Sequence, residues 1–268
     1  MTSIGFSQTL PQPSPLCSIS QVVGLTTIDL EYSRPSAKGR TIFGDLVPYG
    51  EIWRLGANSC TKLTTDTKMM FGTDVLHPGS YAVFAWPGEN GDWTFAFNTD
   101  IEQGGTGSYD EENTLLMTKG KVSECNMVET MSITIQNVTA NSATIRFAWE
   151  KTQVDIDFTV NTDAEADKNI AAAVEKGEEL EMVYYRAGAY YLNTKNDSKK
   201  AMENIEKSLS IKETHNAMYY KARIQKEEGK TKEAIETAKK ALKLAKDAES
   251  EGWASHIEDT SKGWEEEK

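Results

Sequence analysis

The spacing of hydrophobic residues changes once along this chain, and the change divides it into two parts. Up to Val160, β-branched and aromatic residues alternate with polar ones, as in strands that bury one face. From Asn161 onward, apolar residues recur at every third or fourth position among Ala, Lys, Glu and Leu, as in amphipathic helices. We therefore expect a β domain over residues 15–160 and a helical domain over residues 161–268, preceded by a flexible segment over residues 1–14.

Alternation marks the strands of the first part. The stretches that show it are "TTIDLEYS", "SYAVFAW", "WTFAFN", "MSITIQNV", "ATIRFAWE" and "VDIDFTV". Between the second and third of them, Pro87-Gly88 and Asn90-Gly91 predict a turn, so residues 80–98 should form a hairpin. Parallel strands would need helical crossovers, and no helical pattern separates these stretches. The expected fold is an antiparallel β-sandwich or jelly roll, with a barrel as the alternative.

Internal similarity organises the second part. Gly188 and Ala222 lie 34 residues apart, and Ala201 and Ala234 lie 33 apart, each in a similar setting. This is the tetratricopeptide spacing, and the small residues would let paired helices approach closely. Residues 184–211 and 218–245 then align as two helix-turn-helix units that form a short tetratricopeptide-like α-solenoid.

Other residues of the second part would complete this solenoid. A helix over residues 164–176 would cover one end of the stack, and residues 250–268 would cap the other. The side chains expected to fill the seam are Tyr184, Tyr191, Ile205, Tyr219, Ile224 and Leu242. Solenoids commonly hold a partner segment, so we expect protein contacts through this part.

Charge and hydropathy exclude several classes of partner. The net charge is -12, and both parts are acidic, with 10 Lys and Arg against 18 Asp and Glu up to Val160. Binding of nucleic acid needs a dense cationic face, so we expect no nucleic-acid partner. No apolar run approaches the roughly 20 residues that cross a bilayer, so we expect no membrane span.

Metal and cofactor chemistry has no motif in this sequence. The three histidines are far apart, and the three cysteines, which permit at most one internal disulfide, include no C-x-x-C pair. Neither a G-x-S-x-G turn nor a phosphate-binding glycine loop occurs. We therefore predict no metal site, no cofactor and no catalytic residue.

One segment differs from its surroundings in charge. Residues 31–58 hold four basic residues against three acidic ones, whereas the rest of the β part holds 6 against 15. In one interpretation, the cations pin an irregular, glycine-rich loop by bonding main-chain carbonyls and the neighbours Asp45 and Glu51. Alternatively, they grip a carboxylate, sulfate or phosphate, with a tryptophan as a wall and an amide that orients the ligand. The candidate ligand-binding residues are Arg34, Lys38, Arg40, Trp53, Arg54 and Asn58.

The tryptophans allow a sugar as the ligand instead. Trp53, Trp86, Trp93 and Trp149 would form a platform for sugar rings if they shared an exposed surface. Because Trp86 and Trp149 lie within alternating stretches, core packing is the favoured interpretation.

The same segment carries a family resemblance. The motif "RPSAKGRTIFG", followed by "WRLGAN", resembles the bacterial family labelled domain of unknown function twenty-nine eleven, from about Pro13 to the last helices. The resemblance implies export from a Gram-negative cytoplasm, so "SIGFSQ" near the N-terminus would be the remnant of a truncated signal peptide. The alternative is a disordered tail that leads into a Pro-rich spacer. No activity comes with the family.

These observations together predict a periplasmic or secreted binding or assembly module rather than an enzyme. It would bind a small anionic or sugar ligand at the Arg-rich loop, and its helical part would dock either to a protein partner or to its own β domain. The competing hypothesis is a carbohydrate-active enzyme whose carboxylate pair, Asp45 and Glu51, lies on the β domain.

Overall fold

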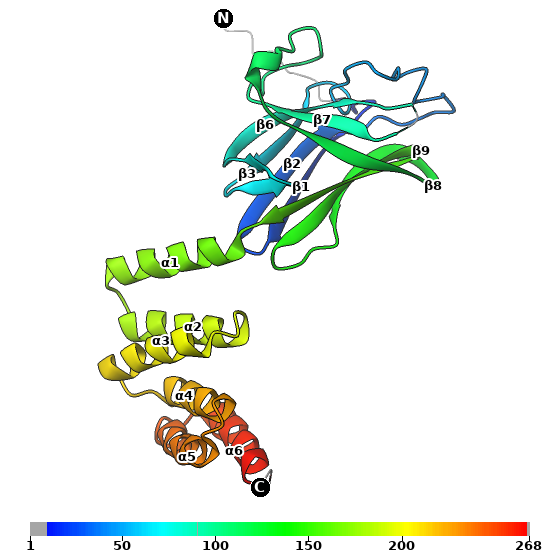
Figure 1. Ribbon diagram of the computed structural model, residues 1–268. Coiled ribbons are helices and arrows are strands. Elements are labelled where there is room, and N and C mark those ends of the chain that lie inside the picture. The colour runs from blue at the N-terminus through cyan, green and yellow to red at the C-terminus, as the bar shows by residue number, and fades with distance from the viewer. Residues whose placement is uncertain (1–9, 90, 267–268) are drawn as a thin grey trace, which may run out of the picture. The chain divides into compact units, whose positions relative to one another are not determined.

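The computed structural model of the chain describes residues 10–89 and 91–266 (Figure 1). It contains two compact units, one ending at Ala166 and the other beginning at Asp167. Strands make up the first unit and helices the second, so the predicted order of β followed by α is confirmed. The signal-peptide remnant predicted at "SIGFSQ" lies outside the described residues.

The first unit is built on one antiparallel sheet. Among the described residues, the sheet has nine strands in the order β1-β2-β3-β6-β7-β8-β9-β4-β5. The strands are β1 (Leu16–Val23), β2 (Thr26–Ser33), β3 (Thr61–Thr65), β4 (Met69–Phe71), β5 (Asp74–Leu76), β6 (Gly79–Trp86), β7 (Trp93–Asn98), β8 (Thr114–Gln136) and β9 (Ser142–Val160). A short 3-10 helix, Glu111–Asn113, precedes β8.

The predicted hairpin is present, but one pair of predicted strands is a single strand. β6 pairs with β7 in antiparallel register, with Ala85 opposite Phe95. The stretches around Phe147 and Phe158 were expected to be separate strands, yet both belong to β9. Glu150, at a φ of 56°, lies where the register with β8 shifts at Val128. A bulge, which adds a residue without ending a strand, therefore interrupts the alternation there.

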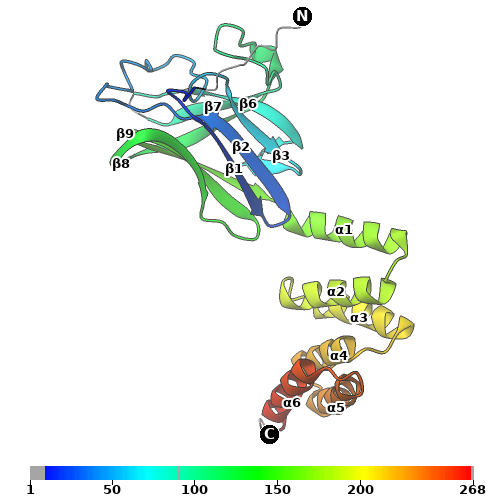
Figure 2. The same cartoon turned by 180° about the vertical axis from the view of Figure 1, so that it is seen from behind.

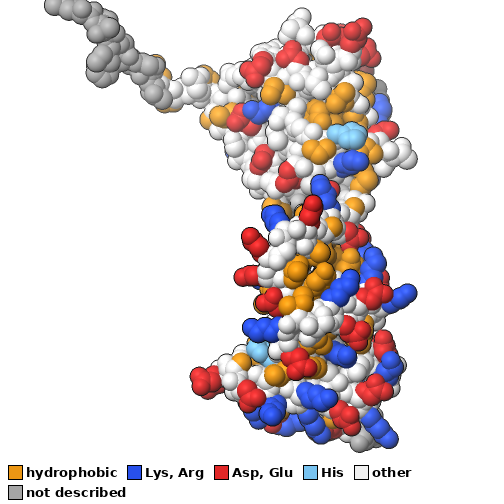
Figure 3. Space-filling view, turned by 90° about the vertical axis from the view of Figure 1, so that its left-hand side faces the viewer, with side chains coloured by type: hydrophobic (Ala, Val, Ile, Leu, Met, Phe, Trp, Pro, Cys, Tyr) orange, Lys and Arg blue, Asp and Glu red, His pale blue; other side chains and the backbone are white. Residues whose placement is uncertain are grey.

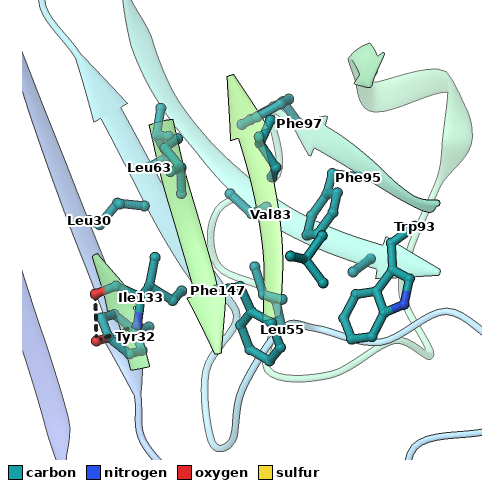
Figure 4. Packing of buried hydrophobic residues seen from close by; sticks show 14 of the residues in the cluster. Leu30, Tyr32, Leu55, Leu63, Val83, Trp93, Phe95, Phe97, Ile133 and Phe147 are labelled. Atoms are coloured by element: carbon teal, nitrogen blue, oxygen red, sulfur yellow. Dashed lines mark hydrogen bonds between the residues drawn. The ribbon is translucent and has the colours of Figure 1, made fainter. Parts of the chain in front are cut away.

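The hydrophobic core fills the space enclosed by the sheet. Figure 4 shows Val83 and Phe95, from β6 and β7, packed near Ile133 and Phe147, from β8 and β9. Phe95 is fully buried, and burial of such a side chain contributes roughly 2–3 kcal/mol to folding. The long strands β8 and β9 therefore fold over the face made by the earlier strands.

A tyrosine joins β2 to β8 inside this core. The Tyr32 hydroxyl donates to the Ile133 carbonyl at 3.1 Å and accepts from the Ile133 amide at 2.9 Å, as drawn in Figure 4. Burial raises the pKa of Tyr32, because an ionised phenol would lose its hydration there.

The second unit consists of paired helices, which Figure 2 shows from behind. Their bounds are α1 (Thr162–Lys176), α2 (Leu180–Asn193), α3 (Ser198–Ile211), α4 (His215–Glu227), α5 (Thr231–Asp247) and α6 (Glu251–Glu266). Side chains cap the N-termini of α3 and α4: Asp197 accepts from the Lys200 amide, and Thr214 from the Ala217 amide. These bonds satisfy amides that the helices themselves leave free.

Small residues bring the helices of a pair together, as expected. A Cβ added to Gly188 in α2 would lie 2.6 Å from the Ile205 side chain of α3. Tyr191 and Ile224 are buried in the same cluster as Ile205. The second cluster holds Tyr219, Leu242, Trp253, Ile257 and Trp264. Helices α2 to α6 thus share two apolar seams.

One predicted seam residue behaves differently. Tyr184 is only half-buried and belongs to neither cluster; the Lys207 ammonium lies 5.4 Å from its ring centre. Charged side chains of both signs intermingle over the helices on the face shown in Figure 3. Among the described residues, no helix has both the length and the hydrophobicity needed to cross a bilayer.

Candidate functional site

The Arg-rich segment connects β2 to β3 and is fastened to the sheet at two points. Near its start, the Ala37 amide donates to the Glu129 carbonyl at 2.7 Å, and Ser36 is bridged to Thr130 of β8. Farther along, Trp53 and Ala85 of β6 exchange two main-chain bonds of 2.8 Å. An irregular segment held in this way presents its side chains in defined positions.

Two of its arginines bond main-chain carbonyls. Arg34 donates its Nε to the Met131 carbonyl of β8 at 2.8 Å. Arg40 donates Nε to the Ala37 carbonyl at 3.0 Å and Nη2 to the Ser36 carbonyl at 2.7 Å. Both therefore stabilise the segment, as one of the two interpretations of the sequence expected.

The expected acidic partners are not engaged with these cations. Asp45 and Glu51 are exposed, and within residues 10–89 and 91–266 neither forms an ion pair with Arg34, Arg40 or Arg54. The acceptors that bond the Arg34 and Arg40 side chains are therefore carbonyls and not carboxylates.

Asn58 has a structural position. Its Nδ2 donates to the Ser14 carbonyl and to the Ser33 hydroxyl, both at 3.1 Å. The residue has a φ of 58°, a left-handed conformation that asparagine tolerates better than most residues. Since the amide protons already have acceptors, Asn58 has little capacity left to orient a ligand.

A hollow of about 430 Å³ opens beside the segment. Lys38, Arg40 and Arg54 border it, and neither an aspartate nor a glutamate is among its lining residues. Leu46 and Val47 contribute to an apolar part of the wall. The volume lies in the range of small-molecule sites, and the charge of its lining favours an anion.

Two nitrogen donors at this hollow have no acceptor in the part of the chain that the structure describes. They are the Nε of half-buried Arg54 and the Nε1 of Trp149, a side chain only 1% exposed. Leaving a buried N–H unpaired costs roughly 1–3 kcal/mol, so native folds rarely do so without a reason. An acceptor placed against either nitrogen would remove this cost.

Tryptophans form the inner wall of the hollow. Trp53 is 8% exposed, and its ring stacks on that of Trp149 with centroids 6.0 Å apart and planes at 19°. Edges of Phe43, Trp93 and Phe147 surround the Trp53 ring. The Trp53 ring is thus buried among other aromatic side chains.

The four tryptophans do not form one exposed platform. Trp53, Trp93 and Trp149 are buried in the main core, which confirms the core interpretation for them. Trp86 is half-buried in a separate cluster, where its ring meets that of Tyr109. Sugar rings stack on open aromatic faces, and these side chains offer little such area.

The structure assembles a subset of the predicted ligand-binding residues. Lys38, Arg40, Trp53 and Arg54 border the hollow, whereas Arg34 and Asn58 are not among its lining residues. Sequence reasoning did not include Trp149 in the site, because its alternating surroundings marked it as a core residue. Its burial was foreseeable, but its position at the same hollow as Arg54 was not.

Metal and disulfide chemistry receive no support from the described residues. Within them, no three His, Cys, Asp or Glu side chains come together in a way that could hold a metal ion. The thiols of Cys17, Cys60 and Cys125 are free, and burial raises the pKa of the Cys60 thiol.

Comparison with known proteins agrees with the motif in this segment. Residues 14–158, more than half of the 268, match the family described as Protein of unknown function (DUF2911). The chain belongs to this family. The DUF2911 region begins just before β1, ends within β9, and includes both Arg54 and Trp149. No match was found among curated proteins or among solved structures.

Proposed function

We propose that this DUF2911 protein is a binding module whose β unit holds a small anion in the hollow beside the Arg-rich segment. The observation that supports this proposal is that two donors at the hollow, Arg54 Nε and Trp149 Nε1, have no acceptor among the described residues. Lys38 and Arg40 border the same hollow. A carboxylate, sulfate or phosphate oxygen is the acceptor that such donors bind best.

An anion fits these donors better than a neutral sugar does. Sugar hydroxyls both donate and accept, so sugar sites usually combine acceptors with donors. The two groups without partners here only donate, and the tryptophan rings that border the hollow are buried. A neutral sugar would leave the excess positive charge without compensation.

The alternative of a carbohydrate-active enzyme has no observation in its favour. Its proposed carboxylates, Asp45 and Glu51, are both exposed and do not border the hollow. A glycosidase pair must flank the bond that it cleaves, which requires both acids at the ligand.

The proposal also includes a location for the protein and a fold type for each of its two units. We place the module in the periplasm or outside the cell, on the strength of the family resemblance. The β unit would be a jelly-roll-like sandwich and the helical unit a tetratricopeptide-like solenoid that contacts protein. The paired helices and the close approach at Gly188 support the second description.

Thermal-shift and titration experiments with sulfate, phosphate, acetate and citrate test the anion site. At a concentration about 100-fold above its Kd, a ligand should stabilise the fold by roughly 2.7 kcal/mol. Arg54→Met removes the donor and one positive charge, and should cut this stabilisation to roughly 1.4 kcal/mol or less. Arg146→Met is the matched control, since it removes the same charge at a residue that pairs with Asp155 and does not border the hollow. The proposal fails if no anion stabilises the protein or if Arg54→Met responds as fully as the control.

A further inference from the structure

The apolar part of the hollow indicates which anions it suits. Leu46 is 45% exposed, although the same turn directs Ile42 and Phe43 into the core. Two main-chain bonds shape this turn, from the Gly44 amide to the Val47 carbonyl at 2.9 Å and from the Val47 amide to the Ile42 carbonyl at 2.8 Å. Leu46 is thereby held at the edge of the hollow.

A single exposed leucine is common on protein surfaces and needs no explanation. Leu46 differs because it borders the same hollow as the buried, unpartnered indole N–H of Trp149. Pro35 and Val47, both buried, add further apolar surface to the wall of the hollow. One hollow thus offers N–H donors and positive charge together with hydrocarbon surface.

From this juxtaposition we infer that the ligand is a small amphipathic carboxylate, such as a short fatty acid. Its carboxylate accepts from Arg54 Nε and Trp149 Nε1, and its hydrocarbon body covers Leu46. This inference rests on the proposed anion site and adds the requirement for an apolar body. A purely hydrophilic anion would leave the Leu46 side chain in water and forgo that contribution.

A chain-length series tests the inference on the full chain. Affinities for acetate, butyrate, hexanoate and octanoate are measured by isothermal titration calorimetry or by chemical-shift titration. A fully buried methylene is worth up to about fourfold in affinity. Because Leu46 is partly exposed, we expect about twofold per methylene, and hence hexanoate binding about 16-fold tighter than acetate.

Two leucine variants separate the hollow from a general hydrophobic effect. Leu46→Ser should reduce the preference for hexanoate over acetate to about threefold while leaving acetate affinity nearly unchanged. Leu25→Ser is the matched control, because Leu25 is 43% exposed in the β1–β2 turn and does not border the hollow. It should keep the full preference.

Ligands with other headgroups show whether a negative result contradicts only the amphipathic ligand or the anion site as well. Equal affinity for acetate and hexanoate, or an unchanged preference in Leu46→Ser, overturns the amphipathic ligand and leaves the anion site standing. Binding of 1-hexanol or hexylammonium as tight as that of hexanoate overturns the anion site itself. Tighter binding of hexyl phosphate than of hexanoate overturns the assignment of a carboxylate.

Discussion

Arg34 and Arg54 belong to one irregular, basic segment. In the sequence, Arg34 precedes a proline and Arg54 follows a tryptophan. In the fold their surroundings differ. Arg34 donates to the carbonyl of Met131, a fully buried residue, and so ties the segment to β8. The Nε of Arg54 is buried beside a hollow, and no residue that the structure describes supplies it with an acceptor. A cation that is already bonded stabilises the fold, whereas an unbonded one retains its capacity for a ligand.

The largest effect expected from this contrast is the loss of binding in Arg54→Met. A hydrogen bond that involves a charged group is worth roughly 1.5–3 kcal/mol, so affinity for a bound anion should fall about 10- to 100-fold. Stability of the ligand-free protein should stay level or rise slightly, because a buried donor without an acceptor has been removed. Calorimetric titration and urea unfolding measure the two quantities. A large loss of stability would show that Arg54 also has a structural role.

The complementary substitution, Arg34→Met, should act on stability instead. It leaves the Met131 carbonyl without its side-chain donor, which should cost roughly 1–3 kcal/mol in urea unfolding. Anion affinity should change less than about twofold, since Arg34 does not border the hollow. If affinity falls as far as in Arg54→Met, the distinction between the two arginines is wrong.

Trp149→Phe separates the indole N–H from the packing of its ring. Affinity for the anion should fall about three- to tenfold, which corresponds to the net value of one hydrogen bond. Trp93→Phe is the control, because Trp93 is equally buried in the same core but does not border the hollow. Both variants lose ring packing, but Trp149→Phe also removes an unpaired buried donor, so it should lose less stability than Trp93→Phe, and only Trp149→Phe should lose affinity.

Arg40 lies between the two extremes and should show the smallest effects. It borders the hollow and also donates to two carbonyls, while remaining exposed. Arg40→Met should therefore lower both stability and affinity by less than about 1 kcal/mol. The effect on affinity should weaken further at high salt, because exposed charges are screened. A salt-independent loss of affinity would instead indicate a direct bond to the ligand.

Local patterns were sufficient for much of the architecture. The strand at residues 93–98 and the helix that begins near Ala164 occur close to where periodicity placed them. Both signals come from neighbouring residues that share one face of one element. Bends inside an element leave a weaker signal, so the bulge at Glu150 was mistaken for the end of a strand.

The family, the change from strands to helices and the basic character of one segment were thus determined by the sequence alone, because each depends on residues close together in the chain. Which arginine is bonded and which is free was decided only by the tertiary structure. The partner of Arg34 is a carbonyl of β8, and the neighbour of Arg54 at the hollow is Trp149 of β9. The bond of Arg34 and the lining of the hollow both bring together residues far apart in the chain, and they exist only once β8 and β9 have folded against the earlier part of the chain.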